Sequence, residues 1–222
     1  MTTFVVRDAR PGTKACDTLS HVTLAQAQAL RGDGFELLWL YASVVTAEDL
    51  AAATGAGLEV GFVLEGLATA TEPTADLGSR MAHAAAGRLR SLGVPPGVTL
   101  FSDLEGAGRA PQAWIEFANA AADATSGLGD IPGAYIGAGT GLTSAEIYGL
   151  RTVRYWKGGS RVVDRNGQLA EPSCGWCVVQ GFPIDYMHPA SGLEIDLDVV
   201  WQDYAGRTAA VIAAQPALAA VA

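Results

Sequence analysis

The sequence predicts an α/β fold, a single (β/α)8 TIM barrel that is slightly irregular in its last third. The chain has 222 residues, which is long for one ordinary domain and short for two. Hydrophobic residues make up 50% of it and charged residues only 17%, so the chain can bury one large core. Strand-like and helix-like runs alternate along it, as a parallel sheet with helical crossovers requires. We therefore expect residues 1–222 to form one barrel domain.

The first half of the chain is expected to supply four strands and three helices. The strands are expected at residues 13–17, 35–41, 58–65 and 98–105. Two helices open on capping boxes, Thr23 with Gln26 and Thr46 with Asp49, in which each side chain satisfies a free backbone amide. The longest helix is expected from Thr74 to Leu92, because glycine and proline residues follow it directly.

The second half continues this alternation less regularly. Strands are expected at residues 133–137, 153–157, 175–180 and 194–200, and a helix at residues 112–125. A short helix is expected to open at Thr143, which has capping-box spacing to Glu146. Residues 158–173 look like a loop or hairpin where a crossover helix would belong. The Ala-rich end from Thr208 to Ala222 is expected to form a last helix that covers the fold.

Charge and hydropathy exclude several classes of protein. A net charge of -9 and a pI near 4.7 argue against phosphate-backbone binding, so no nucleic-acid partner is expected. No apolar run is long enough for a membrane span, and residues 1–12 lack a recognisable export signal. We expect a soluble protein whose location the sequence does not determine. Two alternatives remain open: a component of a phage particle, or a protein that acts outside the cell or on the cell wall.

Acidic residues gather at the expected strand ends, where barrel proteins carry their chemistry. Asp103 and Glu105 are two residues apart and so can face the barrel mouth together, as can Asp196 and Asp198, and Asp17 ends the first strand. Clustered carboxyl groups raise one another's pKa. A protonated acid beside an ionised one can cleave a glycosidic bond.

Other side chains at the same strand ends are candidates for substrate binding. They are Tyr41, Glu65 and Gln180, together with Trp156, whose ring can stack on a sugar face. Two other interpretations of the acids remain open: they cap helices or face solvent, or they hold Mg²⁺ or Ca²⁺. Cys174 and Cys177 have metal-like spacing without a second pair of ligands, so we predict neither a metal site nor an organic cofactor.

Several short motifs, spread over nearly the whole chain, carry a family resemblance. They are Ala-Cys-Asp-Thr at 15–18, Leu-Gly-Val-Pro-Pro-Gly at 92–97, Leu-Phe-Ser-Asp-Leu-Glu at 100–105, Val-Val-Gln-Gly at 178–181 and Ile-Asp-Leu-Asp-Val at 195–199. With these motifs the chain resembles the glycoside hydrolase-like domain of the DUF1906 type, which is itself similar to the family 25 lysozymes.

The resemblance implies a TIM barrel and a role for each of four acids. Glu105 would be the general acid, and Asp103 would support the developing positive charge or an N-acetyl group acting as nucleophile. Asp17 and Asp196 would orient the substrate.

Two functions therefore remain in competition. The first is a hydrolase of cell-wall glycan that cleaves the β-1,4 bond of peptidoglycan without metal or organic cofactor. The second is a non-catalytic barrel that binds glycan or serves, with partner proteins, as a structural component of a phage particle or surface assembly. The intact pair of Asp103 and Glu105 favours the hydrolase, whereas the negative net charge favours the second function.

Overall fold

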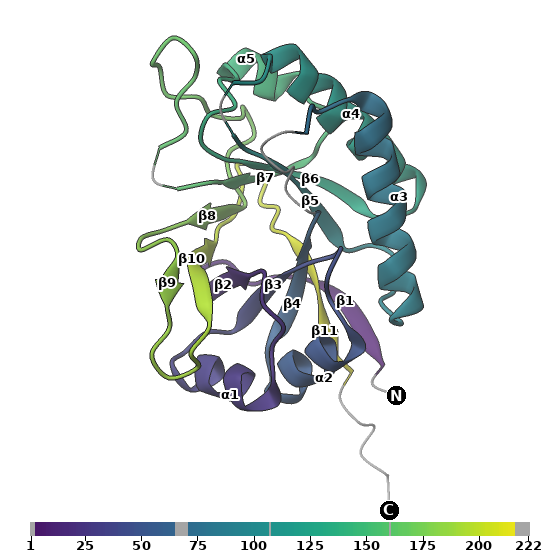
Figure 1. Ribbon diagram of the computed structural model, residues 1–222, viewed down its shortest axis with the longest axis vertical. Helices are drawn as coiled ribbons and strands as arrows, with labels where there is room; N and C mark the ends of the chain where they lie inside the picture. Colours follow the sequence, from purple (N-terminus) through teal and green to yellow (C-terminus); the bar gives the residue numbers. More distant parts are fainter. Residues whose placement is uncertain (1–2, 65–70, 107, 160, 216–222) are drawn as a thin grey trace, which may run out of the picture.

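The computed structural model describes four ranges of the chain, residues 3–64, 71–106, 108–159 and 161–215 (Figure 1). Glu65, one of the predicted substrate-binding residues, lies outside these ranges. Within them the predicted eight-stranded barrel is confirmed. Its strands are β2 (Lys14–Thr18), β3 (Leu37–Tyr41), β4 (Glu59–Val63), β5 (Thr99–Leu104), β6 (Ile131–Ile136), β7 (Arg154–Lys157), β8 (Val178–Gln180) and β10 (Glu194–Val200).

Strand direction separates the regular part of the barrel from its last third. Strands β2 to β7 each run parallel to the next strand of the barrel. β10 closes the barrel between β8 and β2, and it is antiparallel to both. A two-residue strand, β9 (Tyr186–Met187), pairs with the start of β10. Residues 158–173 contain no helix in their described part, as the sequence predicts.

The C-terminal segment corrects the sequence prediction. Residues 210–214 form strand β11 (Ala210–Ala214) and not a helix. β11 is antiparallel to β1 (Phe4–Asp8), a strand that the sequence analysis does not predict, and it pairs with β4 through Ile212 and Val60. The β-branched Val211 and Ile212 are fully buried, so the strand is stabilised by long-range pairing and packing that an Ala-rich composition does not reveal. Residues 216–222 of the predicted helix lie outside the described ranges.

Helices cover the outside of the barrel (Figure 1). They are α1 (Leu24–Gly32), α2 (Ala47–Gly55), α3 (Ala75–Ser91), α4 (Pro111–Gly127) and α5 (Ser144–Tyr148). The three capping boxes expected at Thr23, Thr46 and Thr143 are all present. No helix within the described ranges combines the length and the hydropathy that a membrane crossing needs.

Aromatic side chains fill the barrel interior. Trp39, Phe101 and Trp156 are buried and contact one another with ring centroids 4.9–5.5 Å apart. Two glycines, one on β4 beside β3 and one on β6 beside β5, make room for them. A Cβ at Gly61 would lie 2.0 Å from the Trp39 ring, and a Cβ at Gly133 would lie 2.6 Å from Phe101 Cδ1. These three aromatic side chains therefore form a packed plug in the barrel interior.

Candidate active site

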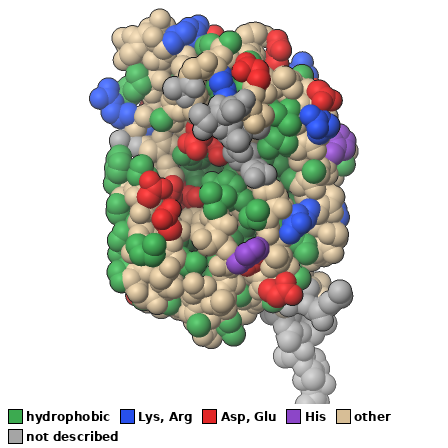
Figure 2. Space-filling view, viewed as in Figure 1, with side chains coloured by type: hydrophobic (Ala, Val, Ile, Leu, Met, Phe, Trp, Pro, Cys, Tyr) green, Lys and Arg blue, Asp and Glu red, His purple; other side chains and the backbone are tan. Residues whose placement is uncertain are grey.

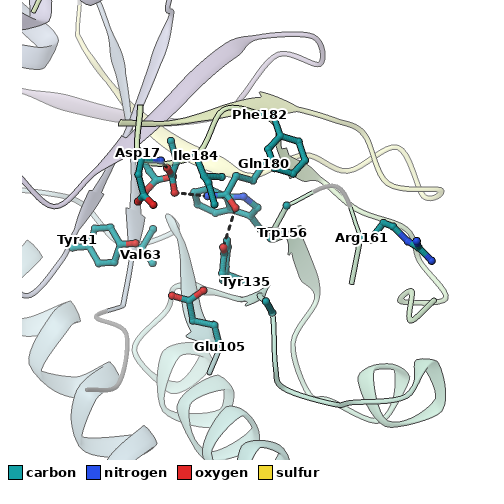
Figure 3. A pocket seen from close by; sticks show the side chains of 15 residues that line it. Asp17, Tyr41, Val63, Glu105, Tyr135, Trp156, Arg161, Gln180, Phe182 and Ile184 are labelled. Carbon is teal, nitrogen blue, oxygen red and sulfur yellow. Dashed lines mark hydrogen bonds between the residues drawn. The ribbon is translucent and has the colours of Figure 1, made fainter. Parts of the chain in front are cut away.

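A cavity of about 440 Å³ opens at the mouth of the barrel (Figure 3). Figure 2 shows acidic side chains gathered in and beside a hollow near the middle of this face. Six of the residues predicted from the sequence line the cavity: Asp17, Tyr41, Glu105, Trp156, Gln180 and Asp196. They come from strands that are far apart in the sequence, and the closure of the barrel brings them together.

Two predicted site residues do not reach the cavity. Asp103 and Asp198 are only 4% and 1% exposed, and neither lines the cavity wall. Asp103 lies on the inward side of β5 two residues before Glu105, and so one layer deeper. β10 enters the barrel from the mouth, because it is antiparallel to its neighbours, so Asp198 lies deeper than Asp196. The prediction that both acids of each pair face the mouth is therefore wrong.

The amide of Gln180 holds Asp196 in place. Gln180 Nε2 donates to Asp196 Oδ2 at 2.7 Å, and Gln180 Oε1 accepts from the Tyr135 hydroxyl at 3.0 Å. The backbone N–H of Asp185 donates to Asp196 Oδ1 at 2.6 Å. Both oxygens of the Asp196 carboxylate are thus bound by donors, which fixes its orientation. Burial raises the pKa of Asp196, and the hydrogen bond from the Asp185 backbone offsets part of this effect.

Sequence reasoning misses Tyr135, which takes part in this network from the inner face of β6. The available signal is a pair of glycines on neighbouring segments. A Cβ at Gly158 would lie 2.7 Å from the Tyr135 hydroxyl, and a Cβ at Gly137 would lie 2.6 Å from Glu105 Cβ. Such glycines mark places where a side chain crosses close to a backbone. Here they make room for two residues that line the cavity.

Burial and mutual repulsion keep protons on several of these acids. Burial, followed by the charges of Asp196 and Asp185, raises the pKa of Glu105. Burial, followed by the charge of Asp196, raises the pKa of Asp17 to about 8. Burial and the charges of Glu105 and Asp17 raise the pKa of Asp103 well above its usual range. Of the groups that line the cavity, Asp17 can therefore hold a proton near neutral pH, and Glu105 is shifted in the same direction.

The rim of the cavity comes from a loop that sequence reasoning also misses. Phe182 and Ile184 line the cavity and are 65% and 47% exposed. Asp185 follows them in the left-handed region with φ 50, and its backbone N–H reaches Asp196 from there. Arg161 lines the cavity too, with its guanidinium pointing away from the labelled carboxyl groups (Figure 3). This rim offers apolar and aromatic surface beside the acids.

Trp156 lies at the base of the cavity. It is only 1% exposed and meets Tyr135 edge to face, with ring centroids 5.4 Å apart.

Among the described residues, no group of three or more His, Cys, Asp or Glu side chains is arranged to hold a metal ion.

Comparisons with known proteins place the fold. No protein-family model and no curated protein matches the sequence. The Tat-secreted protein Rv2525c from Mycobacterium tuberculosis, solved with L-tartrate, matches with a TM-score of 0.64 and 13% identity, over 89% of this chain and 99% of that one. The modular autolysin LytC from Streptococcus pneumoniae, solved with a synthetic peptidoglycan ligand, matches with a TM-score of 0.60 and 12% identity, over 86% of this chain and 47% of that one.

A third solved structure is a muramidase from Acremonium alcalophilum. It matches with a TM-score of 0.55 and 14% identity, over 87% of this chain and 95% of that one. At these identities the likeness concerns the fold. The chain therefore shares its barrel fold with these proteins, and its candidate site lies at the mouth of the barrel.

Proposed function

We propose that this protein is a glycoside hydrolase that cleaves the β-1,4 bond of a peptidoglycan-type cell-wall glycan, and that it belongs with the DUF1906-type domains. The observation that carries the proposal is the setting of Glu105. Glu105 lines a cavity of about 440 Å³ at the barrel mouth, and burial and the charges of Asp196 and Asp185 raise its pKa. The muramidase and the peptidoglycan-bound autolysin with the same fold support a glycan as substrate.

In this proposal Glu105 is the general acid. Its raised pKa favours the protonated form of the carboxyl group, and the proton passes to the oxygen of the leaving sugar as the glycosidic bond breaks. Positive charge then develops on the remaining sugar. Asp196, held by Gln180 and Asp185, supplies a fixed negative charge close to that centre. Water from the solvent then adds to the cationic carbon, and the proton that it releases returns to Glu105.

The other acids act around this pair. Asp17 lines the cavity and orients the substrate. Asp103 is buried beneath Glu105, so we assign it a positioning role that acts through the charges of Glu105 and Asp17 and not through contact with the sugar. Tyr41 and Phe182 provide aromatic surface for sugar rings. Carboxylate acid catalysis of this kind needs no metal or organic cofactor.

A peptidoglycan substrate implies action outside the cytoplasm, and the Tat-secreted neighbour supports this location. The second candidate function is a non-catalytic barrel that binds glycan or serves in a phage or surface assembly. The net charge of -9 favours it, since an acidic protein is repelled by an anionic wall.

Release of reducing ends from purified peptidoglycan decides between the two. Glu105→Gln keeps the size and polarity of the side chain but cannot deliver a proton, so it should lower the rate by about 10²-fold or more. Glu171→Gln, at an exposed position in the loop before β8, is the matched control and should cleave like the wild type. Equal rates for wild type and Glu105→Gln, or no release by either, would exclude the hydrolase and leave the binding barrel.

A further inference from the structure

Asp198 is a buried carboxyl group that the proposed reaction does not use. It is 1% exposed and lies on β10 below the cavity. Among the described residues, no donor reaches either of its carboxylate oxygens with hydrogen-bond geometry. An ionised carboxylate without donors is very unfavourable in a protein interior. The group must therefore be stabilised in another way.

The neighbour that Asp198 does have is another carboxyl group. Across the antiparallel pair of β10 and β2, Asp196 is opposite Asp17, and Asp198 is opposite Ala15. The small Ala15 side chain leaves space on the inner face, so the Asp198 side chain lies diagonally across from Asp17, and the charge of Asp17 acts on it. Two ionised carboxylates have only acceptors and repel each other, so a hydrogen bond between these two groups requires a proton on one of them.

The charged groups that face Asp198 favour a proton on it. Asp17 faces it from β2, and Asp196 precedes it on the same inner face of β10. From β8, Gln180 lies opposite it, but the Gln180 amide donates to Asp196. From β7, the indole of Trp156 offsets only part of the effect, since its Nε1 does not reach hydrogen-bond geometry. Burial comes first and the charge of Asp17 second among the causes that raise the pKa of Asp198.

We propose that Asp198 is a positioning residue that stays protonated and donates a hydrogen bond to Asp17, which fixes the Asp17 carboxyl group at the cavity wall. Asp17 then uses one oxygen for this bond and turns the other toward the cavity. The consequence for glycan binding rests on the proposed function, whereas the position of the proton does not.

The test is a carbon NMR titration of the Asp17 carboxyl group in the wild type and in two variants. Asp198→Asn keeps a donor in place of the protonated acid, so the midpoint for Asp17 should stay close to the wild-type value of about 8. Asp198→Leu keeps the volume but removes the donor, so the midpoint should rise by about one unit, the scale of a single hydrogen bond. Asp196→Asn serves as the reference for a lost like charge and should lower the midpoint.

The direction of the shift decides the outcome. If Asp198 is ionised in the wild type, Asp198→Asn removes a negative charge and lowers the Asp17 midpoint, as Asp196→Asn does, and the proposal is overturned. Asp198→Asn alone decides this, even where Asp198→Leu fails to fold. A wild type that cleaves no glycan would refute the proposed function and leave the titration valid, so the two failures are distinguishable.

Discussion

The barrel consists of two unlike regions that meet at the candidate site. From β2 to β7 the strands are parallel, with helices α1 to α5 among them, and this region contributes Asp17, Tyr41 and Glu105 from strand ends. From β8 on, the described chain has no helix, and β10 is antiparallel to both of its neighbours. This last region contributes Gln180 and Asp196.

The comparison of the two regions shows that the direction of a strand decides which of its acids reaches the cavity. In the parallel region a residue later in the strand is nearer the mouth, so Glu105 lines the cavity and Asp103 is buried. In β10 the order is reversed, so Asp196 lines the cavity and Asp198 is buried. Both regions thus contain two acids separated by one residue. In the parallel region the second acid, Glu105, lines the cavity, and in β10 the first acid, Asp196, does so.

The largest effect on stability is expected where the two regions meet, at the antiparallel pair of β2 and β10. Asp17 on β2 is opposite Asp196 on β10. The pKa of Asp17 is about 8 in the folded protein against an ordinary value of 3.8, so the folded state binds more protons between these values. The free energy of unfolding should therefore fall as pH rises from about 4 to about 8, by an amount on the order of 3–5 kcal/mol.

Urea denaturation at several pH values measures this dependence. Asp17→Asn should flatten the slope and be more stable than the wild type at pH values above about 8. The matched control is Asp8→Asn at an exposed position on β1, which should keep the wild-type slope. A slope as steep in Asp17→Asn as in the wild type would mean that the proton on Asp17 does not contribute to the pH dependence of stability.

The stability of the parallel region depends on glycines that leave space for the buried aromatic side chains. In Gly61→Ala the new Cβ would lie 2.0 Å from the ring of Trp39, which is fully buried. Because Trp39 is confined by Phe101 and Trp156, the variant should lose about 2–3 kcal/mol of stability in denaturant unfolding. Gly87→Ala on the exposed face of α3, where a Cβ meets nothing within 4 Å, is the control and should be as stable as the wild type or more so. Equal stability of the two variants would refute the packing argument.

The last region should affect activity more than stability. Gln180→Met keeps the length of the side chain but removes the bonds to Asp196 and Tyr135, so Asp196 loses its fixed orientation. We expect kcat/KM on glycan to fall about 10-fold, in line with the loss of the hydrogen bond that orients Asp196. We expect little change in Tm. Gln202→Met, at an exposed position, should leave kcat/KM unchanged. A large loss of Tm in Gln180→Met would assign Gln180 to the fold and not to the site.

The sequence predicts the parallel region well and the last region only in part. Capping boxes are local signals, and the three that were expected are all formed. Strand alternation has a period of two in either direction, so it cannot reveal that β10 is reversed or that Asp198 points below the cavity. β11 depends on partners at the other end of the chain, in β1 and β4, and a local pattern cannot identify them.

The residues of the candidate site likewise fall into those that the sequence identifies and those that it does not. Acids at strand ends can be read from the sequence, and Asp17, Glu105 and Asp196 line one cavity. Tyr135 belongs to the site because Gly158, which follows β7, leaves space for its ring, and Gly137 leaves space for Glu105. That relation exists only after the strands have paired, so no single stretch of sequence contains it.

The smallest effect is expected from a cap in the parallel region, where local sequence and structure agree. Thr23 caps α1: its hydroxyl accepts from the Gln26 backbone N–H at 3.3 Å, and the Gln26 side chain accepts from the Thr23 backbone N–H at 3.0 Å. Thr23→Ala removes the hydroxyl and should cost about 1 kcal/mol in urea unfolding, with glycan cleavage unchanged because α1 does not line the cavity. Thr23→Ser keeps the hydroxyl and should restore most of the loss. If Thr23→Ala also lowers activity, then α1 transmits to the site, and the two regions are less independent than their strand directions indicate.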